Sequence, residues 1–339
     1  MQASSQRITG QVRLALMLIV GVAAAAACVV ALMLWKAPVA SAQEEGPTGA
    51  NFVVQCPFSH EKQVDPIVDP GPSGTKPDGT PLTPAHHMHH FFGNTTTDSD
   101  STLESLRAGG TTCAKPKDTA AYWIPKVSWT DSRGKITPLK ANQTFFYYRA
   151  GLKDPVDVNP QPAGLKIVTV QGKNVEWRCQ NGTWSPTPPT RCDNGTLVVR
   201  IFFPDCLAVA KDPTGQPIPD QPVTDTDPND PNAIPHRSHM VDAVTPSTGG
   251  FAKCPSTHPY PVPRLQTNFL FRIPTTKGKP TLSSGAYSTM HVDFFNAWQP
   301  PQQPPPTPPA VDGTLEDLVA RCINAVPFTS SKPKPKDCA

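Results

Sequence analysis

The stretch Gln143-Thr144-Phe145-Phe146-Tyr147-Tyr148-Arg149 decides the fold class of this chain. Aromatic residues and threonine are enriched in strands, and a run of this length matches one strand. Further β-branched and aromatic runs of similar length are bounded by turn residues and cover 51–56, 122–129, 165–170, 197–203 and 267–273. The sequence therefore predicts a mainly β fold.

Proline is the second feature that sets the architecture. The 339 residues include 43 prolines, far above the usual share of about 5%. Proline lacks the backbone donor and stiffens loops, so we expect short strands joined by long proline-rich loops. Segment 211–235 is polar and rich in Asp and Pro, which predicts a surface excursion, and the proline tract 299–309 predicts polyproline II.

One short helix is expected near the C-terminus. Apolar side chains fall at helical spacing in Leu315, Leu318, Val319, Cys322 and Ile323. Asp312 or Thr314 can cap its start. The predicted architecture is a disulfide-tied β-sandwich or jelly-roll-like domain at 51–326, with a basic, proline-rich tail at 327–339.

The N-terminus predicts a membrane anchor or a signal segment. Arg7 and Arg13 precede an uncharged apolar run that Lys36 closes. At 1.5 Å per residue this run makes roughly 33 Å of helix, enough to cross a bilayer core. We expect a cytoplasmic N-terminus at 1–13, a spanning or signal segment at 14–36 and a linker at 37–50. The small residues of Ala40-Ser41-Ala42 suit signal cleavage, so the protein is either membrane-anchored with an extracytoplasmic domain or secreted.

Cysteine usage agrees with an oxidising compartment. Apart from Cys28, eight of the nine cysteines lie beyond the apolar run, and none forms a Cys-x-x-Cys pair. An even number outside the membrane predicts disulfides rather than zinc knuckles or a redox motif. Cys179–Cys192 is the best single pairing, since it closes a loop rich in Gly, Pro and Thr, and Cys338 can tie down the tail.

Charge limits the partners. The formal net charge of +3 is small and dispersed, so we expect no nucleic-acid partner. The sequence contains no Walker A or Rossmann glycine signature. The expected contacts are the membrane, through the N-terminal helix, and a polysaccharide; the oligomeric state stays open.

An ordered series of short motifs resembles a known family. The series includes Asp65-Pro66-Ile67-Val68, His87-x-His89, Phe203-Pro204-x-Cys206, His236-x-Ser238-His239 and Asp293-Phe294-x-Asn296-x-Trp298. It is similar to the domain of unknown function 1996 over about 52–325. That family occurs in secreted proteins of fungi and actinobacteria, often beside carbohydrate-binding modules, and has no established activity. This chain has Leu207-Ala208-Val209 after Cys206 where the family usually has Trp-Asp-Gly.

Histidines are concentrated in a few clusters, four of the nine lying in 86–90. In a strand, side chains two apart share a face, so His87 and His89 point the same way, as do His291 and Asp293. His236 and His239 can converge from a turn. Zinc takes three or four N, O or S ligands, and a zinc or other divalent metal site predicts the set His87, His89, His239 and Asp293. His86 and His90 face away and are expected at the surface.

The histidines have an alternative role. Buried loop backbone must be hydrogen-bonded, and a histidine can serve its carbonyls. The same clusters are then structural.

A hydrolase acting on glycans would need a pair of carboxylates. The candidates for catalysis are Asp65, Asp118 and Asp293, with His89 as a proton carrier. The structural alternative is that Asp65 and Asp118 bond their own backbone near turns.

Aromatic side chains suggest a third role, sugar binding without chemistry. Trp177 and Trp184 lie in the Cys179–Cys192 region and are the expected surface platforms, with Tyr122 and Trp298 as further candidates. The alternative for Trp298 is a place in the core. We therefore expect a domain that binds or modifies cell-envelope or environmental polysaccharide through a His/Asp group, or else a non-catalytic structural domain of the cell surface.

Overall fold

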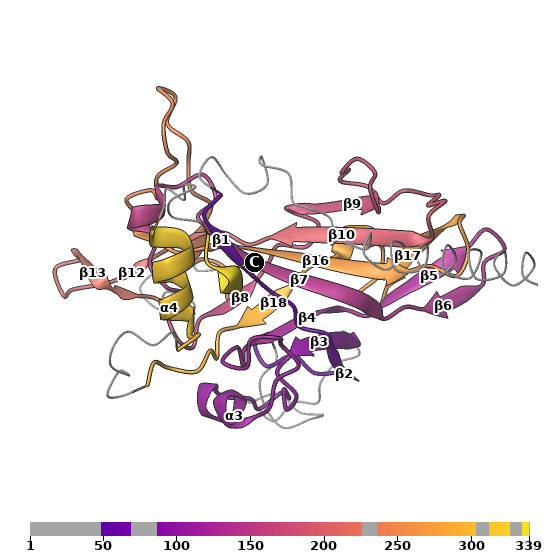
Figure 1. The fold of residues 1–339 in the computed structure, drawn as a ribbon, viewed down its shortest axis with the longest axis horizontal. Helices are drawn as coiled ribbons and strands as arrows, with labels where there is room; N and C mark the ends of the chain where they lie inside the picture. Colours follow the sequence, from indigo (N-terminus) through magenta and orange to yellow (C-terminus); the bar gives the residue numbers. More distant parts are fainter. Residues whose placement is uncertain (1–48, 69–86, 226–235, 303–311, 326–333, 339) are drawn as a thin grey trace, which may run out of the picture. The chain divides into compact units, whose positions relative to one another are not determined.

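The computed structural model describes residues 49–68, 87–225, 236–302, 312–325 and 334–338 (Figure 1). The chain divides into Met1–Ser41 and Ala42–Ala339, and all described residues belong to the second unit. The predicted anchor at 14–36 lies outside the described residues. Within the described ranges, no helix is long and apolar enough to span a bilayer.

The described part of the chain is mainly β and contains two antiparallel five-stranded sheets (Figure 1). The first has the order β1-β7-β16-β10-β9, comprising Asn51–Val54, Ala141–Arg149, Arg264–Arg272, Thr196–Phe202 and Val175–Cys179. The second has the order β2-β3-β4-β18-β8, comprising Phe58–Lys62, His89–Gly93, Ala121–Pro125, Asp293–Phe295 and Lys166–Val168. The prediction of a mainly β fold is confirmed.

Smaller elements complete the described chain. One three-stranded sheet joins β17, β5 and β6 at Gly278–Leu282, Val127–Asp131 and Ile136–Pro138. Another joins β14, β11 and β15 at Met240–Val241, Cys206–Leu207 and Tyr260–Pro261. Short 3-10 turns cover Pro155–Asp157, Tyr287–Thr289 and Lys336–Cys338.

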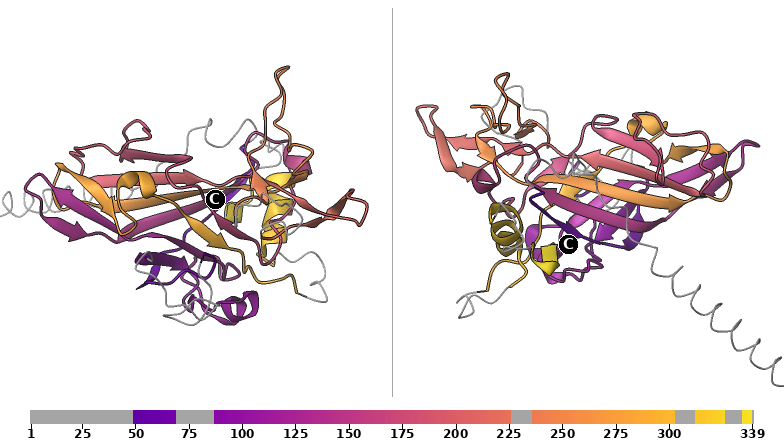
Figure 2. Two further views of the ribbon diagram at one scale, coloured as in Figure 1. Left: turned by 180° about the vertical axis from the view of Figure 1, so that it is seen from behind. Right: turned by 45° about the horizontal axis from the view of Figure 1, so that its top comes forward.

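Part of the expected surface excursion is a hairpin. β12 and β13, at Val209–Lys211 and Pro217–Pro222, pair antiparallel and project away from the large sheets (Figure 2). Residues 226–235 of the excursion, and 303–309 of the proline tract, lie outside the described residues.

The two large sheets face each other across the main core, built from alternate residues of their strands. Phe92 of β3 contacts Phe269 of β16, with ring centroids 4.9 Å apart. The Tyr122 and Tyr148 hydroxyls meet at 2.6 Å between β4 and β7. Because side chains alternate along a strand, the residues next to these face outward.

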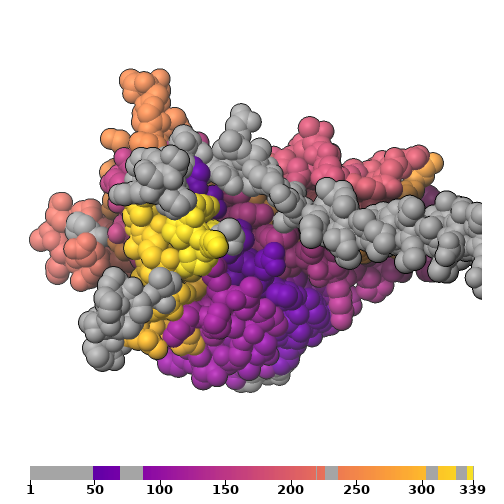
Figure 3. All heavy atoms as spheres, in the orientation of Figure 1, coloured from indigo at the N-terminus to yellow at the C-terminus, as the bar shows by residue number. Residues whose placement is uncertain are grey.

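The two short α-helices among the described residues begin at capping threonines. Thr102 caps α3, at Leu103–Ala108, through a capping box. Thr314 accepts from Asp317 N at the start of α4, at Leu315–Val319, and a π turn at Ala320–Asn324 continues it. The predicted C-terminal helix is confirmed; its apolar residues join the main core, and it lies at the surface in Figure 3. α3 was not predicted.

Four disulfides tie the described chain: Cys56–Cys113, Cys179–Cys192, Cys206–Cys254 and Cys322–Cys338. The predicted Cys179–Cys192 pair is confirmed, as is the role of Cys338 in holding the tail.

The expected strand at 122–129 is two strands. β4 ends at Pro125 and β5 begins at Val127, and the two belong to different sheets. The backbone of Lys126 between them donates to Met88 O at 2.8 Å and accepts from Ser283 N at 2.9 Å. The chain therefore changes its partners at this residue, which an apolar run cannot reveal.

Candidate functional site

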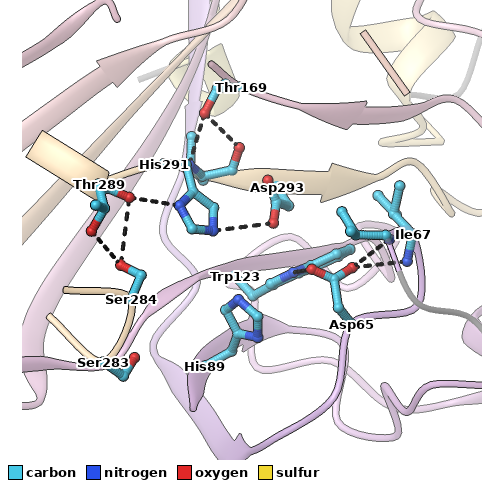
Figure 4. A network of polar contacts seen from close by, with 12 residues as sticks. Asp65, Ile67, His89, Trp123, Thr169, Ser283, Ser284, Thr289, His291 and Asp293 are labelled. Carbon is cyan, nitrogen blue, oxygen red and sulfur yellow. Dashed lines mark hydrogen bonds and ion pairs between the residues drawn. The ribbon is translucent and has the colours of Figure 1, made fainter. Parts of the chain in front are cut away.

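The second five-stranded sheet carries a polar group on its outward face. Phe92, Tyr122 and Phe294 face the main core. Their sequence neighbours Phe91, Trp123 and Phe295 form a separate cluster on the opposite face. Asp293 sits on that face too, since it pairs with Trp123 on β4 and with Val168 on β8. His89 at the start of β3 and His291, which precedes β18, bring further polar side chains to this group (Figure 4).

Three histidine rings meet there. The rings of His87 and His89 have centroids 4.2 Å apart, and His291 lies 5.1 Å from His87 and 6.0 Å from His89. Ligand atoms of these three residues all lie within 4.8 Å of one another. The alternation of side chains along a strand predicted that His87 and His89 point the same way. The structure confirms this.

Hydrogen bonds fix the orientation of two of these rings. His89 Nδ1 lies 2.9 Å from Val64 O, and His291 Nδ1 lies 2.8 Å from Thr289 O. A carbonyl oxygen only accepts, so Nδ1 must carry the proton in both neutral rings. Nε2 of each ring then carries the lone pair. Metal-binding histidines are typically held by such a bond on the other ring nitrogen.

Two carboxylates complete the group. Ligand atoms of Asp65, His89 and Asp293 also lie within 4.8 Å of one another. Asp65 Oδ1 accepts from the backbone N–H groups of Ile67 and Val68, at 2.9 Å each. Its Oδ2 faces Trp123 Nε1 at 3.5 Å (Figure 4). Asp65 is therefore both the local turn residue that sequence suggested and a neighbour of the histidines.

Asp293 is the less satisfied acid. Its side chain is fully buried, and among the described residues no hydrogen bond of ordinary geometry reaches either oxygen. Burial raises the pKa of Asp293 well above its usual range, and the charge of Asp65 raises this pKa further, whereas Arg237 and Trp123 lower it. Burial likewise raises the pKa of Asp65.

The spacing between His291 and Asp293 suits a cation. His291 Nε2 lies 3.8 Å from Asp293 Oδ2, too far for a hydrogen bond. Burial lowers the pKa of His291 to about 4, so the ring is neutral near pH 7 and its lone pair faces the carboxylate. Zinc binds nitrogen and oxygen at about 2.0–2.2 Å, so two ligands of one ion lie up to about 4 Å apart.

His239 is not part of this group. Its Nε2 donates to Lys166 O at 2.8 Å, so this nitrogen has no lone pair for a metal, and burial lowers the pKa of His239 to about 4. The three-residue spacing from His236 suggested convergence, but His236 has φ +60° and bonds Asp225 instead. The third imidazole is His291, whose pairing with Asp293 was the available signal.

His90 is buried, which corrects its expected surface position. It faces away from His87 and His89, as alternation requires, but its Nε2 lies 2.9 Å from Glu61 Oε2 and its ring packs on Phe58. His86 lies outside the described residues.

Asp118 lies in the main core rather than at the histidine group. Its Oδ1 accepts from Ala120 N at 3.1 Å and its Oδ2 from the Tyr122 hydroxyl at 2.9 Å. Burial raises its pKa to about 7. Cys56 and Cys113 lie nearby, but their disulfide leaves no thiolate for a metal.

Three of the four expected sugar platforms are interior residues, which corrects that prediction. Trp177 is fully buried, Tyr122 bonds Asp118, and Trp298 donates from Nε1 to the Tyr148 hydroxyl at 3.1 Å. Their faces pack against the core, so a sugar ring cannot stack on them. Trp184 is half-buried, with the guanidinium carbons of Arg178 and Arg200 each 4.0 Å from its ring centroid.

Comparison with known proteins gives one family. The model of the domain of unknown function DUF1996 matches residues 65–298. This chain belongs to the DUF1996 family. No curated protein and no solved structure matches it.

The DUF1996 match contains the whole polar group. It begins at Asp65, includes His87, His89 and His291, and extends past Asp293. β1 and the C-terminal helix lie outside the match, yet both contribute to the same core as the DUF1996 strands. The family assignment supplies no activity, so function must be argued from the group itself.

Proposed function

We propose that this chain binds one divalent cation, zinc in the first place, at His87, His89, His291 and Asp293. The observation that carries the proposal is the juxtaposition of three imidazoles and two buried acids, with two rings held through Nδ1 by backbone carbonyls. Such a donor set suits zinc and related ions. Asp65 would stand beside the ion as a second-sphere acid or a further ligand.

The buried acids support a cation rather than an apolar packing role. Two neighbouring carboxylates disfavour each other's ionisation, so charging both is unfavourable in a buried site without water. A positive ion reverses this effect, because its charge favours the ionised acids. His87 is the half-buried member of the group, so its side would be the approach for a ligand.

We further propose that the centre acts on polysaccharide. The resemblance to secreted proteins that often carry carbohydrate-binding modules supports this ligand class. Bound zinc polarises an oxygen and lowers the pKa of a bound water to about 7. Asp65, which stands beside the proposed ligands, would hold a proton next to that water.

The first test is metal analysis of the full-length chain, purified without a polyhistidine tag, exposed to zinc and then desalted. We expect about one zinc per chain, lost in His89→Ala and His291→Ala. His258→Ala is the matched control, because His258 also serves a carbonyl, Ser238 O at 2.8 Å, away from the group. A folded, metal-free wild type would reject the proposal.

The second test is turnover. Wild-type protein loaded with zinc is incubated with a panel of polysaccharides, and soluble products are separated by chromatography. His89→Ala and Asp293→Asn should abolish any product while the disulfides and near-ultraviolet circular dichroism persist. Product formation that survives both substitutions would show that the activity lies elsewhere.

A structural role is the second candidate function. Among the described residues, five histidines bond backbone carbonyls: His60, His89, His239, His258 and His291. On this alternative the histidines hold loops only. It predicts that His89→Ala and His239→Ala lower the melting temperature alike, with no metal in either.

A further inference from the structure

A cavity of about 140 Å³ lies at the β8 edge of the second five-stranded sheet. Its apolar lining includes Val168 and Phe202. The charged residues of the lining, among those that the structure describes, are Lys173, Arg237 and Asp242. Because β8 pairs with β18, the cavity begins one strand away from Asp293.

The cavity and the histidine group share a wall. Thr169, which lines the cavity, donates from N to Val292 O at 3.2 Å and accepts at Oγ1 from Val292 N at 2.9 Å. Gly172 N donates to Met290 O at 2.8 Å. Gly172 has φ +69°, and a Cβ there would lie 2.6 Å from Ser288 O, so only glycine permits this approach. The segment that carries His291 is thus bonded to Thr169 of the cavity lining and to Gly172, the residue before Lys173 of that lining.

Among the described residues that line the cavity, Lys173 and Arg237 outnumber the single acid. Arg237 is half-buried and lines this cavity. Lys173 is exposed at the same cavity. Among the described residues of the lining the acid is Asp242, which already pairs with Arg264, whose Nη2 lies 3.7 Å from its Oδ1.

We propose that this cavity receives the anionic substituent of an acidic polysaccharide, a carboxylate or a sulfate ester, with Arg237 and Lys173 as the recognition residues. The inference rests on the proposed function and names its substrate class. Arginine binds planar or tetrahedral oxyanions through two parallel N–H groups. The volume holds several water-sized groups, at about 30 Å³ each, so it suits a charged substituent and leaves the glycan backbone outside, beside the metal centre.

The test is affinity electrophoresis of the full-length chain in gels that contain polygalacturonate, dextran sulfate or neutral dextran. We expect retardation by the acidic polymers alone. If polygalacturonate binds more strongly than dextran sulfate, the recognised anion is a carboxylate. If dextran sulfate binds more strongly, the recognised anion is a sulfate ester. The double variant Arg237→Gln/Lys173→Gln should bind at least tenfold more weakly. Since Lys173 is exposed, Lys173→Gln alone should fold normally and still weaken binding about threefold.

The matched control is Arg133→Gln/Lys135→Gln, which removes two exposed cations from the turn between β5 and β6. It should bind as the wild type does. Retardation by neutral dextran equal to that by the acidic polymers would overturn the inference. So would unchanged binding in the cavity variants.

Metal analysis separates this inference from the proposed function. If the wild type contains no metal but binds acidic glycan through Arg237 and Lys173, the anion site stands and the metal centre does not. If the wild type holds zinc but shows no preference for acidic glycan, the anion site alone is rejected.

Discussion

Asp118 and Asp293 are both fully buried acids on the second five-stranded sheet or beside it, yet their surroundings differ. Asp118 lies in the main core, where a backbone N–H and the Tyr122 hydroxyl donate to its two oxygens. The network continues through Tyr148 to Trp298. Asp293 lies on the outward face of the sheet among lone pairs of histidines and a second acid.

The difference teaches how to separate a structural acid from a binding one. Donors already present satisfy Asp118, so the protein has completed that network. Around Asp293 lie Asp65 and His89, and among the described residues neither of its oxygens has a hydrogen bond of ordinary geometry. A cation is the partner that turns such an arrangement from a cost into a stabilising contact.

The largest expected effect is the pH dependence of the Asp118 network. The pKa of Asp118 is about 7 in the folded chain against 3.8 for the ordinary group. Between these values the folded chain binds more protons, so the free energy of unfolding falls as pH rises. The contribution is complete below about pH 4, is lost as pH rises through about 7, and amounts to about 4 kcal/mol. Urea unfolding of wild type and Asp118→Asn from pH 4 to 8 measures it; parallel profiles would contradict it.

Removing each acid sharpens the comparison directly. Asp118→Ala leaves the Tyr122 hydroxyl and Ala120 N–H without their acceptor, which should cost about 3 kcal/mol. Asp293→Ala should leave the metal-free protein as stable as the wild type or more so, because it removes a poorly satisfied buried acid. Zinc should stabilise the wild type and Asp118→Ala but not Asp293→Ala. Equal losses in both metal-free variants would break the distinction.

His239 is a structural histidine whose contribution to stability should depend on pH in the opposite direction to that of Asp118. Its pKa is lowered from 6.5 to about 4, so the unfolded chain takes up the proton first as pH falls. The stabilisation is complete above about pH 6.5 and lost as pH falls to about 4, about 3 kcal/mol in all. His239→Gln should lack this part of the acid sensitivity in thermal unfolding, while its zinc content stays that of the wild type. If His239→Gln lost its zinc, His239 would be a metal ligand after all.

The smallest expected effect concerns Trp123, which lowers the pKa of both Asp65 and Asp293. Trp123→Phe keeps an aromatic ring and removes the indole N–H. We expect about tenfold weaker zinc binding by competition with a chelating dye, with a loss of stability of about 1–2 kcal/mol from the space that the indole leaves. Trp129→Phe is the control, since Trp129 Nε1 donates to Thr275 at 3.0 Å away from the group. Equal zinc affinity in Trp123→Phe would remove the indole from the site.

Strand content was predictable because it depends on local composition. The runs at 143–149, 197–203 and 267–273 match β7, β10 and β16 closely. Short strands with polar sequences were not, as in β2, whose Phe58-Ser59-His60-Glu61-Lys62 pairs with β3. Such a strand is stabilised by its neighbours rather than by its own residues.

Sequence alone predicted two separate pairs within the candidate group, but not which third histidine completes it. Alternation along a strand placed His87 with His89, and His291 with Asp293. Which distant histidine joins them depends on sheet pairing, and spacing alone favoured His239 over His291. The buried positions of Trp177 and His90 have the same origin, because one sequence does not reveal which face of a strand another sheet or loop covers.

The two halves of the group also have a consequence for the life of the chain. Asp65 and His87 stand near the start of the family region, and His291 and Asp293 near its end, roughly 200 residues later. Closing so long a loop is entropically costly before the intervening strands have formed. A growing chain therefore carries only half of its donors until synthesis reaches β18. Cation uptake would be a late step of maturation, and a truncated chain that ends before His291 would remain unable to retain the ion.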